Sequence, residues 1–391
     1  MKQKTVLSIG AGFPQIDFIK SLKDMGLYVI AIGKGRNAEK AIDLCDEFIE
    51  LNTHCEDEVL SWLKNYSKKI DAVGSYAGGK AIRTLQVVND ALELHTSIPK
   101  ELMVGMDKFS QQKLYEKYTL TSISSWDMKN ISNDPTLIDN INKFIVKPAI
   151  GRGSSGVEVI DRNELLVAIN ESKYGGESII QEFREGLEYR VLVLIQKGTL
   201  KLLAPVVRNS FHNTVFLGRL SYDDKNTKRI EDYFMSFINK CNIQNVILKA
   251  DILVSSNHID MIEMDIGVGG GTYYKQYLTE LFDYDLNSEY INLILNNNVT
   301  PASKPFENKI MDYIYNLTGK PINVDLTKIE RVLQPIIGNH KIIKNLLSPE
   351  FSGKFNSNAH FIVTVIHSNS RITNFELNKI INQKIFNNEH S

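Results

Sequence analysis

Apolar runs alternate with amphipathic stretches along the first hundred residues of the chain. Thr5–Ile9 and Leu27–Ile32 are short apolar runs of the kind found in buried strands. Between them, from about Gln15 to Met25, apolar residues recur at helical spacing. Two further strand-like runs follow at Glu47–Leu51 and Asp71–Ser75. Strands that alternate with helices in this way predict a parallel sheet of βαβ units.

The turn after the first strand argues against one class of cofactor. It carries glycines at positions 10 and 12, but Gln15 stands where a dinucleotide-binding fingerprint has its third glycine, so a nicotinamide cofactor is not expected. The loop Ser75–Lys80 follows the carboxyl end of another strand, where open α/β sheets place ligands. This loop is either a substrate contact or an ordinary βα turn.

The middle of the chain changes to paired strands. Phe144–Lys147 is an apolar run that ends in a lysine, and strand character resumes at Val157–Ile160. The loop between them is rich in glycine and hydroxyl groups and contains Gly151, Arg152, Gly153, Ser154, Ser155 and Gly156. Glycines let backbone amides approach a polyanion, and the lysine adds positive charge, which suits a nucleotide triphosphate. A plain tight turn is the alternative, and no Gly-Lys-Ser/Thr opens a helix here as in a Walker P-loop.

Two later pairs of strands carry acidic residues. The first pair turns at Gly186 and places Glu188 just before a strongly apolar strand, which is also compatible with an exposed charged turn. The second pair carries Asp251, Glu263 and Asp265. Positions 263 and 265 share one face of a strand, and Asp251 on the partner strand can reach that face.

Three carboxylates on one sheet face repel one another unless a hard cation lies between them. Oxygen ligands suit Mg²⁺, which typically uses one or two carboxylates together with substrate phosphates, and Mn²⁺ is an alternative ion. A solvated acidic face is the other interpretation, but the apolar residues that flank these acids favour a buried setting.

The order of these motifs resembles the ATP-grasp superfamily over roughly residues 1–300. The resemblance implies an α/β and α+β fold with a Rossmann-like pre-ATP-grasp domain, an ATP-grasp domain with a movable lid, and then a small α+β domain. The predicted ranges are 1–106 for the first domain, 107–300 for the second with its lid at about 110–185, and 301–391 for the third. The last range contains a strand-like run at Phe361–Ile366 and a final amphipathic helix near Asn374–Phe386, but no catalytic motif.

The resemblance also implies site residues. The nucleotide-binding set comprises Lys108, Lys147, the loop from Gly151 to Gly156, Gln181, Glu182, Phe183 and Glu188. In it, Lys147 contacts the α-phosphate, the glycine loop closes over the β- and γ-phosphates, residues 181–183 form the hinge that reads adenine, and Glu188 binds the ribose. Lys108 resembles a phosphate-facing lysine, although a lysine at a helix start is more often solvated. The implied Mg²⁺ ligands are Asp251, Glu263 and Asp265.

Two departures from the family pattern bear on the acceptor site. The family usually has asparagine where this chain has Asp265, and the following run, Ile266–Thr272, lacks the arginine that meets the acceptor. Arg208 and Arg190 are the candidate catalytic cations, because they lie on strands that commonly line the same site, whereas a surface role is the alternative for each.

Composition narrows the cellular setting. The 391 residues carry a net charge of −1, so neither nucleic acid nor a membrane surface is expected as a partner. The three cysteines, Cys45, Cys55 and Cys241, lack a metal-binding pattern and indicate reduced thiols. The chain opens directly into a strand, with no signal peptide or membrane-spanning run, so a cytoplasmic enzyme is expected, with a homodimer as one compatible assembly.

These features predict an ATP-dependent ligase. Phosphoryl transfer from ATP converts a carboxylate into an acyl phosphate, which an amine of an amino acid or small peptide-like substrate attacks, giving an amide, ADP and phosphate. Such chemistry needs positioning and charge neutralisation more than a protein nucleophile. The alternatives are another ATP-grasp reaction, such as bicarbonate-dependent carboxylation or phosphorylation, and a nucleotide-binding protein with a decayed site.

Overall fold

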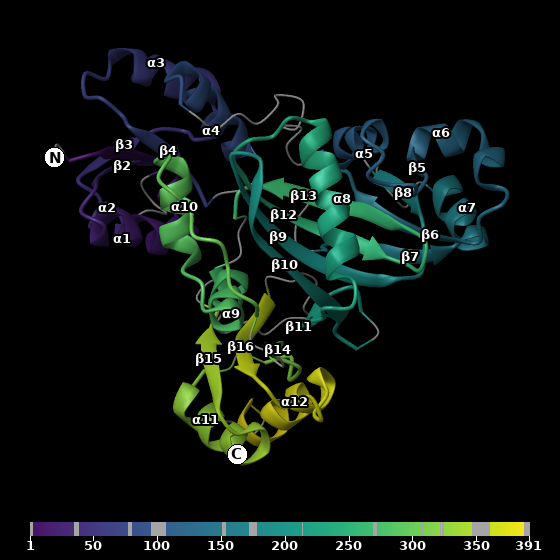
Figure 1. Cartoon of the computed structure of the whole chain (residues 1–391). Coiled ribbons are helices and arrows are strands. Elements are labelled where there is room, and N and C mark those ends of the chain that lie inside the picture. Colours follow the sequence, from purple (N-terminus) through teal and green to yellow (C-terminus); the bar gives the residue numbers. More distant parts are fainter. Residues whose placement is uncertain are drawn as a thin grey trace.

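A computed structural model of the chain describes residues 3–34, 39–76, 80–94, 107–150, 154–171, 178–212, 214–268, 272–305, 309–320, 322, 324–345 and 360–386. The strands in these ranges form three sheets, of four, eight and four strands. Figure 1 shows the N-terminal sheet at the left, the large sheet in the centre and the small sheet at the right. This mixture of α/β and α+β units confirms the predicted fold class.

The N-terminal sheet is parallel and has the strand order β3-β2-β1-β4. Its elements are β1 (Thr5–Ile9), α1 (Ile16–Asp24), β2 (Tyr28–Gly33), α2 (Glu39–Ile42), β3 (Glu47–Glu50), α3 (Glu56–Asn65), β4 (Ala72–Gly74) and α4 (Lys80–Ala91). The strands and the helix predicted from the alternating pattern are therefore present, with shifts of one or two residues at their ends.

The small sheet has the order β5-β8-β6-β7 and a core of its own. Its elements are β5 (Ser125–Asp127), α6 (Met128–Asn133), β6 (Lys143–Pro148), β7 (Glu158–Asp161), α7 (Arg162–Asn170) and β8 (Ser178–Glu182). In that core, the half-buried Trp126 packs edge-on against Phe144 with ring centroids 6.4 Å apart. By contrast, Leu114 and Tyr115 of α5 (Lys108–Lys117) lie inside the range predicted for the lid but pack in the core of the large sheet.

The large sheet is antiparallel and has the order β13-β12-β9-β10-β11-β14-β16-β15. Its strands are β9 (Leu187–Gln196), β10 (Thr199–Ser210), β11 (Leu217–Tyr222), β12 (Val246–Val254), β13 (Ile259–Ile266), β14 (Ile310–Tyr315), β15 (His340–Lys344) and β16 (Phe361–His367). The last three come from the segment predicted to be a separate C-terminal domain. The domain boundary near residue 300 stays a prediction. Strands before it and strands after it belong to the same sheet.

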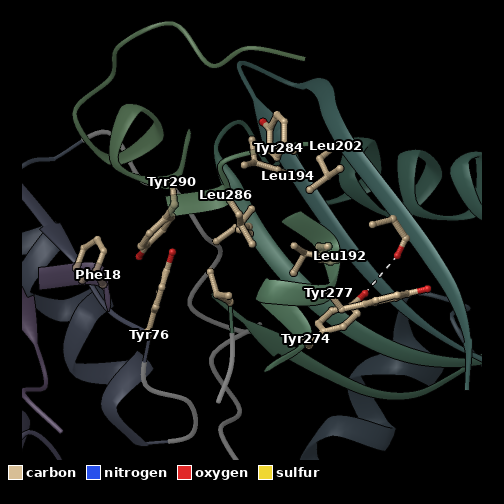
Figure 2. Close-up of a cluster of buried hydrophobic side chains, with 14 of the residues drawn as sticks. Phe18, Tyr76, Leu192, Leu194, Leu202, Tyr274, Tyr277, Tyr284, Leu286 and Tyr290 are labelled. Atoms are coloured by element: carbon tan, nitrogen blue, oxygen red, sulfur yellow. Dashed lines mark hydrogen bonds between the residues drawn. The ribbon is translucent and has the colours of Figure 1, made fainter. Parts of the chain in front are cut away.

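Helices cover both faces of the large sheet. On one face, Val191 and Val193 belong to the same core as Phe234 of α8 (Thr227–Lys240). On the other face, Leu192 and Leu194 belong to a core that contains aromatic residues of α9 (Thr272–Phe282) and α10 (Leu286–Ile294). Figure 2 shows this second core, which continues into the N-terminal unit.

Aromatic side chains join the N-terminal sheet to the rest of the molecule. Tyr76, which follows β4, stacks on Tyr290 of α10 with ring centroids 5.4 Å apart, and both rings contact Phe18 of α1 (Figure 2). Lys275 of α9 forms an ion pair with Asp17 of α1 at 3.0 Å. The predicted ligand loop Ser75–Lys80 therefore begins in a packed junction, while its residues 77–79 lie outside the described ranges.

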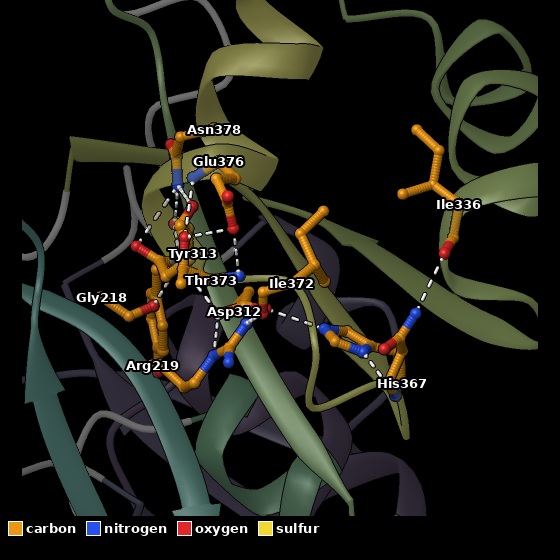
Figure 3. A network of polar contacts seen from close by, with 12 residues as sticks. Gly218, Arg219, Asp312, Tyr313, Ile336, His367, Ile372, Thr373, Glu376 and Asn378 are labelled. Carbon is orange, nitrogen blue, oxygen red and sulfur yellow. Dashed lines mark hydrogen bonds and ion pairs between the residues drawn. The ribbon is translucent and has the colours of Figure 1, made fainter.

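A buried ionic network ties the C-terminal strands to β11. The guanidinium of Arg219 donates to both carboxylate oxygens of Asp312 at 2.7 Å, and Asp312 also bonds His367 Nε2 at 2.8 Å (Figure 3). The backbone N–H of Asn369 donates to His367 Nδ1, so the other ring nitrogen, Nε2, carries a hydrogen and donates it in the hydrogen bond to Asp312. The network joins β11, β14 and β16, and the helices α11 (Leu326–Ile337) and α12 (Asn374–Ile381) pack in the core beside these strands.

Candidate active site

Charged side chains gather on one face of the large sheet, at its β13 side. Lys249 pairs with Asp265, and Asp251 pairs with Glu263 on β13 and with Arg190 on β9. Directly paired residues of an antiparallel sheet point to the same face. The five side chains therefore lie together, as the period-two spacing of the acids predicts.

A β-bulge makes this grouping possible. Asp251 pairs with Glu263, but the next residue, Ile252, pairs with Met261, so Ile262 is an extra residue on β13. A register slip of one residue transfers a side chain to the opposite face of a sheet. Without the bulge, Asp251 would pair with Ile262 and point away from both other acids.

Asp251 is already paired with a guanidinium. Arg190 Nε and Arg190 Nη2 donate to the two carboxylate oxygens of Asp251, each at 2.8 Å. Burial acts to raise the pKa of Asp251, but the charge and hydrogen bonds of Arg190 outweigh it and leave the pKa well below the usual value. Arg190, predicted as a catalytic cation, is thus committed to a carboxylate of the protein.

The other two acids differ in their partners. Asp265 Oδ2 forms an ion pair with Lys249 Nζ at 3.0 Å. Burial raises the pKa of Glu263, and the negative charge of Asp265 raises it further. Within the described part of the chain, no three His, Cys, Asp or Glu side chains are placed to hold a metal ion together. Mg²⁺ typically takes one or two carboxylates beside phosphates, so Asp251, Glu263 and Asp265 all stay predicted ligands, and both oxygens of Asp251 already accept from Arg190.

Two lysines face these carboxylates. Lys147 ends the buried part of β6, and burial together with the charge of Lys108 lowers the pKa of Lys147 to about 8, although Glu263 opposes this decrease. Lys108 opens α5, whose N-cap Asp107 accepts hydrogen bonds from the next turn, and burial lowers the pKa of Lys108 as well. The small sheet and α5 therefore bring two cations within electrostatic range of the acidic face.

The glycine-rich loop is described only in part. Gly151, Arg152 and Gly153 lie outside the described residues, while β6 and β7 form the predicted antiparallel hairpin. Ser154 and Gly156 both have left-handed backbone conformations, with φ of 58° and 71°. A Cβ at position 156 would lie 2.9 Å from Pro148 Cγ, so this turn requires glycine there.

The predicted hinge uses several of its polar groups internally. The backbone N–H groups of Glu182 and Phe183 donate to Ser124 and Lys143 carbonyls at 3.0 and 2.9 Å. The amide of Gln181 donates to Gln112 and Ser125 side chains, each at 3.0 Å, and the Glu182 carboxylate pairs with Arg184. Adenine recognition by residues 181–183 stays a prediction, and the two bonded N–H groups are not available for it in this conformation.

Glu188 and Arg208 are brought together. Arg208 Nη1 donates to Glu188 Oε2 at 2.6 Å, and Nη2 donates to the Val215 carbonyl at 3.1 Å. Arg208 is 8% exposed, and its Nε has no hydrogen-bond partner among the described residues. The predicted ribose ligand and the predicted acceptor cation thus lie side by side, with the Arg208 side chain 6% exposed and the Glu188 side chain 27% exposed.

Sequence reasoning missed Lys249. Its signal was its position two residues before Asp251, which places both side chains on the same face of a strand. The pairing with Asp265 could not be read from this spacing, because it depends on the register of β12 and β13.

A known family model matches the middle of the chain. Residues 119–265 match the family model of the ATP-grasp domain. This part of the chain is therefore an ATP-grasp domain, which confirms the resemblance of its motifs. No curated protein matches the sequence.

Solved structures with similar folds cover nearly the whole chain. Phosphoribosylglycinamide synthetase from Anaerococcus prevotii is 17% identical, with a TM-score of 0.70, over 97% of this chain and 98% of that one. Carboxyaminoimidazole ribonucleotide synthase from Aspergillus clavatus, complexed with ATP, is 13% identical, with a TM-score of 0.70, over 97% of each chain. L-amino acid ligase from Bacillus licheniformis is 15% identical, with a TM-score of 0.66, over 94% of each chain. At these identities the likeness establishes a shared fold. None of the helices in the described ranges has the length and apolar character needed to cross a membrane.

Proposed function

We propose that the protein is an ATP-dependent ligase that activates a carboxylate and joins it to an amine. The observation that carries this proposal is that Lys147 and Lys108 lie within electrostatic range of Glu263, where Lys147, Glu263 and Asp265 belong to the matched ATP-grasp domain. Lysines neutralise phosphate oxygens and carboxylates hold Mg²⁺, so the two groups together suit the triphosphate of MgATP. Structures of similar fold that contain ATP or ADP support the same nucleotide.

The metal site would be built from two of the three acids on the sheet face. Glu263 and Asp265 would hold Mg²⁺ together with phosphate oxygens, and Mg²⁺ when bound would neutralise charge that develops on the transferred phosphoryl group. Lys147 and Lys108 would orient the phosphates from the side of the small sheet. Residues 181–183 and Glu188 would hold the adenosine, and the 151–156 loop would close over the phosphates and exclude water.

The chemistry proceeds in two steps that need no protein nucleophile. An oxygen of the substrate carboxylate attacks the γ-phosphorus, the bond to ADP breaks, and an acyl phosphate forms. The amine nitrogen then attacks the acyl carbon, inorganic phosphate leaves with the oxygen it received, and the nitrogen loses a proton. Because an acyl phosphate hydrolyses in water, a closed lid protects it.

Arg208 is the better of the two candidate cations for a substrate carboxylate. Arg190 donates its Nε and Nη2 to Asp251, whereas the buried Nε of Arg208 has no hydrogen-bond partner among the described residues. A buried unpaired donor is costly, so a ligand oxygen at this position would satisfy it. Glycinamide, aminoimidazole and amino acid ligases of similar fold support an amine as the second substrate, and an amino acid or small peptide-like amine is our proposal for its class.

The test is to trap the activated acid. The protein is incubated with MgATP, hydroxylamine and pools of carboxylates, and both ADP and acyl hydroxamate are measured. We expect hydroxamate to form in step with ADP for one acid class, and Lys147→Ala to abolish both products. ADP release that depends on bicarbonate without hydroxamate would establish carboxylation instead, and a stable phosphorylated product would establish a kinase. Absence of nucleotide binding would support a decayed site.

A further inference from the structure

Within the part of the chain that the structure describes, two of the three acids of the site form an ion pair with a basic side chain, and the third does not. Asp251 is held by Arg190, Asp265 is held by Lys249, and Glu263 has no ion-pair partner among the described residues. Like charges on neighbouring positions of one sheet face destabilise it, and opposite charges on paired positions stabilise it. The protein therefore supplies the positive charge that we expected only from a metal ion.

Lys249 lies at the centre of this charge pattern. Its Nζ lies 3.0 Å from Asp265 Oδ2, and Asp251, two residues further along β12 and paired with Glu263, projects from the same face of the sheet. Its side chain is 17% exposed and that of Asp265 is 24% exposed, so solvent screens their attraction only in part. The neighbours on the other face, Ala250 and Met264, are buried and apolar, which confines the charge to the site.

We propose that Lys249 is a positioning residue: it is the internal counter-ion of Asp265 and allows that carboxylate to stand beside Glu263 before any metal binds. The inference rests on the proposed function for the identity of the metal site. It also explains how an aspartate is accommodated at position 265. The positive charge of Lys249 cancels the negative charge of Asp265, so the pair adds no net charge to the site. Lys249 and a divalent cation then compete for one carboxylate.

Four variants separate this role from simple packing. Lys249→Met and Asp265→Asn each remove one charge at nearly constant size, the double variant restores the net charge, and Lys249→Arg preserves it. The melting temperature is measured without metal or nucleotide. Each single neutralisation should lower it by about 3 °C or more, because it leaves a partly buried charge unpaired, and the double variant should lose clearly less than the sum.

The second measurement is the binding of Mn²⁺ alone, followed by electron paramagnetic resonance of the free ion. Lys249→Met should bind Mn²⁺ roughly tenfold more tightly, because a competing positive charge is gone. Asp265→Asn should bind it more weakly, and both the double variant and Lys249→Arg should lie near the wild type. A lysine with only a packing role would not tighten metal binding when it is removed.

The matched control is Lys23→Met, which breaks the partly exposed Lys23–Asp46 pair at 2.6 Å in the N-terminal unit. It should change the melting temperature slightly and Mn²⁺ affinity not at all. Additive losses of melting temperature in the double variant, or Mn²⁺ binding that does not tighten in Lys249→Met, would overturn the inference. Neither measurement uses ATP, so a protein that passes both but forms no ADP would refute the proposed function and leave the role of Lys249 standing.

Discussion

At the scale of single residues, the proposed nucleotide site makes its clearest prediction at Lys147. This lysine is 9% exposed and lies among charged groups of both signs. Lys147→Ala should weaken MgATP binding, because it removes a positive charge that contacts the phosphates. The melting temperature of the free protein should not fall, because burial of this charge without a ligand costs desolvation energy. Loss of a charge that pairs with a desolvated anion costs about 2–5 kcal/mol. Isothermal titration calorimetry measures the effect, and unchanged affinity would refute the assignment.

The lowered pKa of Lys147 predicts a pH dependence. The lysine loses its proton in the free protein near its pKa of about 8, whereas bound phosphate favours the charged form. MgATP affinity should therefore be constant below pH 7 and fall as the pH rises through 8, by up to about tenfold per pH unit. In Lys147→Arg the fall should disappear, because arginine does not titrate in this range. Persistence of the step in that variant would place the titrating group elsewhere.

The lowered pKa of Lys147 in the folded protein also predicts how the free energy of unfolding changes with pH. Because this pKa is depressed below the ordinary lysine value of 10.5, the unfolded chain binds more protons between about pH 8 and 10.5. The contribution of Lys147 to stability therefore rises with pH across this window. The site accepts a destabilising charge at neutral pH, which is consistent with a residue selected for binding.

Arg208 predicts a separation between binding and turnover. Arg208→Lys keeps the positive charge but cannot contact Glu188 and the Val215 carbonyl while presenting a third donor. ADP formation should fall roughly ten- to hundredfold, and MgATP affinity should stay near the wild-type value. Steady-state ADP assays and calorimetry check the two parts. Arg229→Lys is the matched control, because Arg229 of α8 is also partly buried and donates to Asn226 Oδ1 at 3.1 Å. Full activity of Arg208→Lys would move the acceptor site to Ser75–Lys80, residues 267–271 or Arg190.

At the scale of the elements, a set of hydrogen bonds joins the small sheet to the large sheet. Arg184 donates to the side chain and carbonyl of Ser122 at 2.6 and 2.8 Å, and Ser122 donates through its N–H to the buried Asp260 at 2.6 Å. These contacts hold together the two chain segments that enter and leave the small sheet. Charge-assisted hydrogen bonds therefore help to hold the small sheet against the large sheet.

Arg184→Ala should loosen this connection without unfolding either sheet. Each hydrogen bond to a charged group contributes about 1.5–3 kcal/mol, so amide hydrogen exchange in segments 119–124 and 183–186 should accelerate by tenfold or more. Mass spectrometry of the exchanged peptides provides the measurement. Arg162→Ala, which removes a similarly half-exposed arginine of α7 that contacts Asp139, is the control. Equal exchange in both variants would mean that packing alone fixes the lid.

The strands and hairpins also show which features the sequence could predict. The period-two placement of Glu263 and Asp265, and the lysine that ends Phe144–Lys147, were sufficient to predict two hairpins and one shared site. The bulge at Ile262 was not predictable, because nothing in the local pattern distinguishes it from its apolar neighbours, yet it decides that Asp251 joins the other acids. Ion pairs across strands, such as Lys249–Asp265, follow from register and were missed for the same reason.

For the whole molecule, the C-terminal segment is part of the main sheet. Residues 310–315 are buried throughout, and β14 pairs with β11 on one side and β16 on the other. The sequence indicated a boundary from the polar, proline-containing stretch at 296–305, which in the structure follows α10 and precedes β14. Long-range antiparallel pairing leaves no local signature, so the joining of these strands could not be predicted.

A chain that ends at residue 300 should therefore not form a stable monomer. The truncation exposes the edge of β11, leaves Arg219 without its buried partner Asp312 and removes the aromatic contact of Phe211 with Tyr315. Exposed strand edges promote self-association. Size-exclusion chromatography and circular dichroism should show aggregated or poorly folded protein, whereas a chain that ends at residue 386 should behave as the full chain does. A monomeric, MgATP-binding 1–300 fragment would show that the predicted boundary is also an energetic one.

The packing of Trp126 against Phe144 gives the molecule a built-in optical reporter. The chain has only two tryptophans, Trp62 in α3 and Trp126 in β5. Replacement of Trp62 by phenylalanine leaves one indole emitter, half-buried in the small sheet, whose fluorescence depends on its contact with solvent and with the ring beside it. Stopped-flow records of that emission would follow the arrival of nucleotide at the lid in real time, without any attached dye.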